Sequence, residues 1–175
     1  MMKHIYKYLL GLLVFAAVSC KKDQPAVEYS PIFPISGEWH THVFNEDGSN
    51  VATLNPSTGK SFSLSLAALS TYNTADNDDD IAWLKFSTVA YPFGILAKVK
   101  VDVPSVAILP GEYVNILPVK NTSIHLIEAK ILQNASKQPS GVLADSILVK
   151  YKTGVDNKVY MIKGHRRTQW PDDQR

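Results

Sequence analysis

The sequence predicts an all-β domain folded as a closed antiparallel barrel of about eight strands. Three features support this prediction: the alternation of apolar and polar residues, the spacing of turn-forming residues, and the residues on the first and last expected strands. From Gly37 onward apolar and polar residues alternate with a period of two, and no segment carries a long helical apolar stripe. Turn-forming residues separate the alternating segments at intervals of about 8–15 residues. A tryptophan lies near the start of the first segment and an arginine pair near the end of the last, and these segments are neighbours in a closed barrel.

The expected strands follow this alternation, and stretches rich in Asn, Asp, Gly and Pro separate them. They are 38–44, 51–54, 61–72, 81–89, 94–103, 106–109, 112–120, 123–132, 143–152 and 158–168. The acidic stretch 74–80 and the polar stretch 134–141 are expected to be loops. A two-sheet sandwich is the alternative architecture. It would not explain why a tryptophan lies on the first strand and an arginine pair on the last.

The N-terminus has the pattern of an export signal. Lys3 and Lys7 precede the uncharged apolar run 9–18, which is shorter than the ~20 residues that a transmembrane helix needs. The run leads through small residues to Cys20, the chain's only cysteine, and this arrangement resembles a bacterial lipobox. The alternatives are an ordinary secretory signal with an unmodified cysteine and a cytosolic chain with a buried one.

These patterns predict the domain organisation and the location. We expect a lipoprotein signal peptide at 1–19, a lipidated Cys20 and tether at 20–35, and a barrel domain at 36–175. The protein is then an exported, membrane-anchored lipoprotein of the bacterial cell envelope, in the outer membrane, facing the periplasm or the surface. The net charge of +2 includes basic signal residues, and no basic stripe interleaves with aromatics, so no nucleic-acid partner is expected.

The barrel-closing residues are expected to be Gly37, Trp39, Arg166 and Arg167. Trp39 would plug the barrel, and one of the two arginines would lie over its ring. Gly-x-Trp on the first strand with arginine on the last resembles lipocalins and their calycin relatives. More narrowly, about residues 35–172 resemble Bacteroidetes lipoproteins described as lipocalin-like, lipid-binding domains. The resemblance implies a lipocalin-like up-and-down barrel that binds a small hydrophobic or amphipathic ligand such as a lipid.

The inward face of the barrel supplies the candidates for ligand contact or core. They are Thr41, Val43, Phe62, Leu64, Leu66, Trp83, Val99 and Val101. Every barrel needs such a face, so these residues serve as core whether or not a ligand is bound.

The sequence gives little indication of a metal site. His40 and His42 share a face of the first strand, which alternation turns outward if Trp39 points inward. Asp76, Asp78 and Asp80 resemble the opening of a calcium loop, but the glycine and glutamate that complete such a loop are missing. No other metal site and no cofactor are expected.

We therefore expect a non-catalytic, lipid-anchored barrel that binds a lipid-like molecule; no oligomeric state follows from the sequence. One alternative is a barrel filled with side chains that has a structural or partner-docking role. The other is a secreted hydrolase. The sequence has no Gly-x-Ser-x-Gly nucleophile elbow, and His125 lies in an apolar strand.

Lipidation of Cys20 is directly testable. Labelled palmitate should enter the wild-type protein in its host envelope and should not enter Cys20→Ala, because the thioether-linked lipid needs the thiol. Immunoprecipitation followed by autoradiography measures the incorporation. Equal labelling of both proteins would contradict the anchor.

Overall fold

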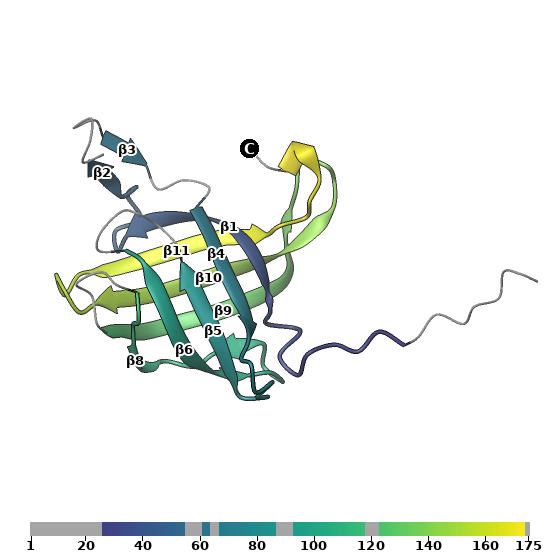
Figure 1. The fold of residues 1–175 in the computed structure, drawn as a ribbon. Helices are drawn as coiled ribbons and strands as arrows, with labels where there is room; N and C mark the ends of the chain where they lie inside the picture. The colour runs from purple at the N-terminus through teal and green to yellow at the C-terminus, as the bar shows by residue number, and fades with distance from the viewer. Residues whose placement is uncertain (1–25, 55–60, 64–66, 87–92, 118–122, 174–175) are drawn as a thin grey trace, which may run out of the picture.

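The prediction of an all-β barrel is confirmed by a computed structural model that describes residues 26–54, 61–63, 67–86, 93–117 and 123–173. Eight antiparallel strands close on themselves (Figure 1). The described residues include one short 3-10 helix, η1 (Pro171–Asp173). No described helix has the length and apolar character required to span a membrane.

The strands follow one another around the barrel with few departures from an up-and-down order. They are β1 (Gly37–Asn45), β2 (Ala52–Leu54), β3 (Ser61–Ser63), β4 (Ala67–Asn73), β5 (Ile81–Phe86), β6 (Ile95–Asp102), β7 (Ala107–Ile108), β8 (Gly111–Val114), β9 (Ser123–Lys137), β10 (Leu143–Thr153) and β11 (Val159–Arg166). The order around the barrel is β10-β11-β1-β4-β5-β6-β7-β9, and β9 pairs with β10 to close it. Strand β8 pairs with β9 as an additional strand, and β2 and β3 form a separate hairpin.

The β2–β3 hairpin and the N-terminal segment leave opposite ends of the barrel (Figure 1). The hairpin corrects the expectation of one continuous strand over 61–72. Strand β3 pairs with β2, whereas β4 pairs with β1 and β5, so the two pieces belong to different sheets. The stretch expected as a loop at 134–141 also differs, because β9 continues to Lys137 and pairs with the start of β10.

Side chains alternate between the core and the surface along most strands, as the period of two predicts. In β6 the residues Ile95, Ala97, Val99 and Val101 are buried, whereas Lys98 and Lys100 are exposed. The same alternation in β1, β5, β10 and β11 contributes to one continuous core.

Side chains replace part of the backbone ladder between β6 and the chain around β8. The Asn115 side chain accepts a hydrogen bond from Leu96 N at 2.8 Å and donates one to Gly94 O at 3.0 Å. The Tyr113 hydroxyl accepts one from Lys100 N at 3.3 Å. Because buried backbone groups need partners, these two side chains keep the wall closed where the strand is irregular.

Strands β1 and β11 approach each other unusually closely at Gly164. A Cβ atom there would lie 2.0 Å from His40 O and 2.7 Å from Thr41 Cγ2. The first of these is a backbone atom and cannot move without shifting β1. Glycine is therefore required at this position for the first and last strands to pair.

Gly164→Ala should destabilise the fold by about 1–3 kcal/mol or more, because the added methyl forces the strands apart. Gly111→Ala is the matched control, since its Cβ would meet only the Tyr113 ring at an ordinary 3.4 Å. Urea denaturation followed by circular dichroism measures both. Equal midpoints for the two variants would contradict the close approach.

Candidate functional site

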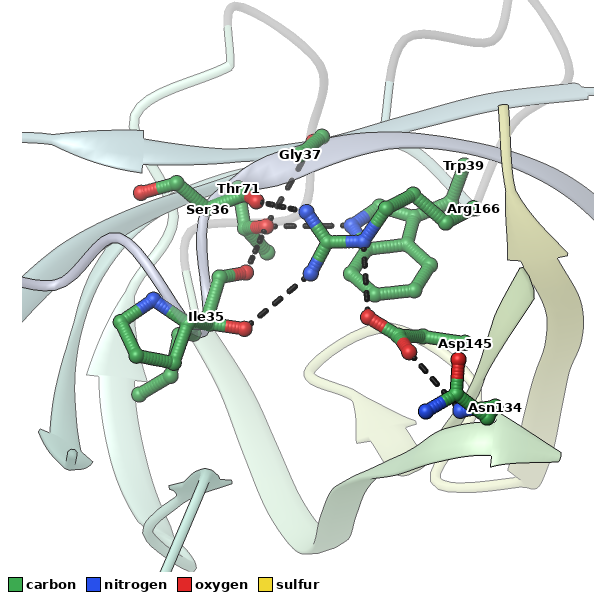
Figure 2. Close-up of polar contacts among 9 residues, drawn as sticks. Ile35, Ser36, Gly37, Trp39, Thr71, Asn134, Asp145 and Arg166 are labelled. Atoms are coloured by element: carbon green, nitrogen blue, oxygen red, sulfur yellow. Dashed lines mark hydrogen bonds and ion pairs between the residues drawn. The ribbon is translucent and has the colours of Figure 1, made fainter. Parts of the chain in front are cut away.

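Arg166 is the centre of a set of contacts that closes one end of the barrel. Its guanidinium carbon lies 4.6 Å from the centroid of the Trp39 ring. Its Nε donates to Asp145 Oδ2 at 3.0 Å, and its two terminal nitrogens donate to the carbonyl oxygens of Ser36 and Pro34 (Figure 2). One side chain on β11 thus joins β1, β10 and the segment that precedes β1.

Trp39 and Asp145 are themselves held by further hydrogen bonds. The Trp39 side chain has an exposed fraction of 0%, and its Nε1 donates to Thr71 Oγ1 at 3.0 Å. The Thr71 hydroxyl donates in turn to Ile35 O at 2.6 Å (Figure 2). Asp145 Oδ1 accepts from Asn134 N at 2.9 Å. These bonds fix the ring and the carboxylate on either side of the guanidinium.

The two terminal arginines have different surroundings. A Cβ at Gly37 would lie 2.7 Å from Arg166 Nη1, so the glycine of Gly-x-Trp leaves room for this guanidinium. Arg167 points outward and donates to Glu38 Oε2 at 2.9 Å, with both side chains substantially exposed. Arg166 alone lies over the tryptophan ring.

The segment before β1 plugs the same end of the barrel. A turn over 31–35 is held by hydrogen bonds from Phe33 N to Ser30 O and from Ile35 N to Ile32 O, each 2.9 Å long. Ile32 and Ile35 are both fully buried in the core. Ile32 and Ile35 therefore belong to the folded core, although both lie in the stretch 20–35 that is expected as a tether.

Side chains fill the described interior of the barrel. Those with no exposed surface come from strands all around it: Trp39, Leu69, Ala82, Leu84, Phe86, Ile95, Ala97, Ile124, Leu126, Val149, Tyr151 and Ile162. A side chain with an exposed fraction of zero borders no space that admits a water molecule. No ligand chamber therefore lies beside these residues, as expected for an interior only as wide as its own side chains.

Aromatic residues fill the interior toward the other end. The Tyr151 hydroxyl donates to Phe93 O at 3.2 Å, across the barrel from β10 to the residues before β6. The Phe93 and Tyr160 rings meet edge to face with centroids 4.8 Å apart. Burial raises the pKa of Tyr151, and burial followed by the hydrogen bond to Asp156 raises that of Tyr160. Both phenols therefore stay neutral and pack as core residues.

The structure places some of the candidate ligand contacts in the core. Thr41, Val43, Val99 and Val101 are buried there. Leu64 and Leu66 and the side chain of Phe62 lie outside the described residues, as does Cys20.

Trp83 is placed differently from the expectation, on the outer face of β5. Its ring stacks on Tyr72 with centroids 6.4 Å apart, and Lys98 Nζ lies 5.5 Å from its centroid. The charged Lys85 two residues later shares this outward face, and Leu84 and Phe86 take the interior. The charged Lys85, which must stay in water, therefore determines which face of β5 points outward, and Trp83 lies on that face.

The histidines of β1 meet a third histidine on the outer face. His40 and His165 are register partners with ring centroids 5.7 Å apart. Burial, followed by the neighbouring His40, lowers the pKa of His165. Among the described residues, His40 Nδ1 and His165 Nε2 are buried without a hydrogen-bond partner.

Neither the histidines nor the acidic turn forms a metal centre within the described part of the chain. No group of three or more His, Cys, Asp or Glu residues is placed there to hold a metal ion. In the acidic turn of Asp76, Asp78 and Asp80, the Thr74 hydroxyl donates to Asp78 Oδ2 at 2.7 Å. Asp78 thus serves to close the turn.

A polar hollow of about 360 Å³ lies across β8, β9 and the end of β10. His125 Nδ1 lies 2.6 Å from Glu112 Oε1, and Ser123 and Lys152 also line the hollow. Sequence analysis did not identify this group, because Glu112 and His125 become neighbours only through the β8–β9 register. No hydrogen bond joins Ser123 to His125 among the described residues, so the group is a paired acid and imidazole with a serine nearby.

An apolar groove of about 280 Å³ lies on the outer face of β9, β10 and β11. Its lining includes Leu132 and Leu148, and Lys130 and Lys163 also border it. The alternation of β9 and β10 signals outward apolar residues here, but their convergence depends on the strand register.

The closing contacts can be tested by their effect on stability. Trp39→Ala should lower the free energy of unfolding by about 3–5 kcal/mol, as expected for a fully buried large aromatic. Arg166→Lys should lower it by about 1–3 kcal/mol, because lysine cannot make the forked hydrogen bonds. Arg167→Lys is the matched control and should change it by less than about 1 kcal/mol. Denaturant titration measures all three, and equal effects of the two arginine substitutions would contradict the role of Arg166.

Comparison with known proteins identifies a family and a similar solved structure. None of the curated proteins searched matches the chain. A crystal structure of a structural-genomics protein of unknown function from Bacteroides ovatus is 13% identical, with a TM-score of 0.44. The similarity covers 76% of this chain and 42% of that protein, so the chain spans less than half of its length. A family model described as "Lipid-binding putative hydrolase" matches residues 24–171, and the chain belongs to this family.

Proposed function

We propose that the protein is a lipid-anchored, extracytoplasmic, lipocalin-like barrel that binds a small amphipathic, lipid-like molecule and catalyses no reaction. The observation that carries the proposal is the match of residues 24–171 to a lipid-binding family. The closed barrel fits this function, and the apolar run that leads to Cys20 supports the anchor.

The filled interior constrains where such a ligand binds. Trp39, Ile32 and Ile35 occupy one end, and Tyr151 reaches across the barrel toward the other. A buried acyl chain would have to displace these side chains, and opening a cavity in a close-packed core costs several kcal/mol. Binding outside the core avoids that cost. The ligand is therefore bound on the surface of the barrel.

Ester hydrolysis is a second candidate, favoured by one observation. The Glu112–His125 pair has the carboxylate-to-Nδ1 contact that orients a general base, and Ser123 lines the same hollow. The missing Ser123–His125 hydrogen bond, and the exposure of both members of the pair, favour binding over catalysis.

Ligand binding should be visible with the chain from residue 21 onward, which contains every described strand. Native mass spectrometry of this purified chain should show an added lipid-sized mass. Delipidation should remove it, and incubation with a long-chain fatty acid should restore an adduct. No added mass before or after incubation would contradict the proposal.

A p-nitrophenyl ester of a fatty acid separates the two candidates in the same preparation. We expect no ester cleavage above the buffer rate. Cleavage that disappears in both His125→Ala and Glu112→Gln would instead establish hydrolysis.

A further inference from the structure

The apolar groove on the outer face of β9, β10 and β11 is lined by residues from all three strands. Its lining includes the outward-facing Leu132, Ser146 and Leu148, together with Ile147 and Gly164. The groove holds about 280 Å³, slightly less than the usual range for sites that bind small molecules.

The strand register explains the walls of this groove. Leu148 on β10 is paired with Lys163 on β11 and with Lys130 on β9. The two lysines therefore flank Leu148 on both sides, and both are exposed. Their methylene stems cover apolar surface while the ammonium groups stay in water. The result is an apolar floor between two cationic walls.

The apolar surface in this groove is uncovered. Leu132 is 50% exposed, and Leu148 is partly exposed. A single exposed leucine needs no explanation, but a concave apolar surface between charged walls is typical of a binding site.

The charge around the groove is predominantly positive. Lys130 Nζ forms an ion pair with Glu128 at 2.7 Å. Both residues lie on β9, the strand that pairs with the Leu148 strand β10. Lys163 Nζ lies 5.4 Å from the centroid of the Phe44 ring and forms no ion pair with a carboxylate of the described residues. The two walls thus carry two ammonium groups and one carboxylate, and this net positive charge favours binding of an anion.

We propose that this groove binds a free, single-chain anionic amphiphile such as a fatty acid. The acyl chain lies on Leu148 and Leu132, and the anionic head lies between Lys130 and Lys163. The volume fits one chain, and the concave shape fits a free molecule better than the flat surface of a bilayer. This inference rests on the proposed lipid-binding function and assigns the site and the ligand's charge.

Fluorescence titration of the chain from residue 21 with a dansyl-labelled undecanoic acid tests the site. Lys130→Glu combined with Lys163→Glu should weaken binding of this carboxylate by about tenfold or more, because two attractive charges become repulsive. The methyl ester of the same probe should lose less affinity. Leu148→Glu should abolish binding of both probes. Lys85→Glu is the control, since β5 lies on the opposite wall of the barrel.

Circular dichroism and thermal unfolding verify that each variant is folded; if Leu148→Glu is not, the exposed lysine variants carry the test. Binding by the wild type with unchanged affinity in the lysine double variant would overturn the groove assignment and leave the proposed function standing. Equal losses for the acid and its ester would overturn the anionic head. Binding only to anionic vesicles would overturn the free amphiphile. No binding by the wild type would overturn the proposed function as well.

Discussion

Closure of this barrel depends on Arg166 lying against Trp39. The two residues are register partners on the last and first strands, so their contact forms where the sheet meets itself. The same guanidinium binds Asp145 on β10 and carbonyl oxygens of the segment before β1. A planar group with five donors can satisfy these partners at once and still stack on a ring, which an ammonium cannot do. The residues around it follow from this geometry, including a glycine at Gly37.

The closure of only eight strands limits the width of the barrel interior. A barrel of this size is just wide enough for its own side chains or for one small ligand. Here Ile32 and Ile35 enter from the plugged end and Tyr151 crosses toward Phe93, so side chains take the available volume. The charged side chains of both candidate sites lie on the outer face. The lysine-walled groove and the Glu112–His125 pair are therefore both sites on the barrel wall.

Local patterns in the sequence were sufficient to predict the fold. The alternation of Lys98 and Lys100 with valines sets the phase of β6, and Gly-x-Trp with a terminal arginine marks the two strands that meet. In β5 the phase was misjudged because Trp83 was expected inside, whereas Lys85 on the same face keeps it outside. The break between β3 and β4 has no such local signal, since it depends on different partner strands.

The candidate sites could not be predicted in the same way, because they arise between strands. His125 and Glu112 are far apart along the chain and meet through the β8–β9 register. The groove needs Leu148 to be paired with a lysine on each neighbouring strand. Each residue alone is an ordinary surface residue. Only the register of three strands combines them into an apolar floor with charged walls.

The plugged end also determines where the proposed anchor would hold the barrel. Ile32 is fixed in the core, so the chain from Cys20 to this residue can span at most about 40 Å when fully extended. A lipid on Cys20 would thus keep the Trp39 end near the membrane and direct the end that carries the β2–β3 hairpin away from it (Figure 1). The groove runs along the side wall between these ends, on β9, β10 and β11. In that position it is open to single amphiphiles that leave the membrane, and it does not require the barrel to enter the bilayer.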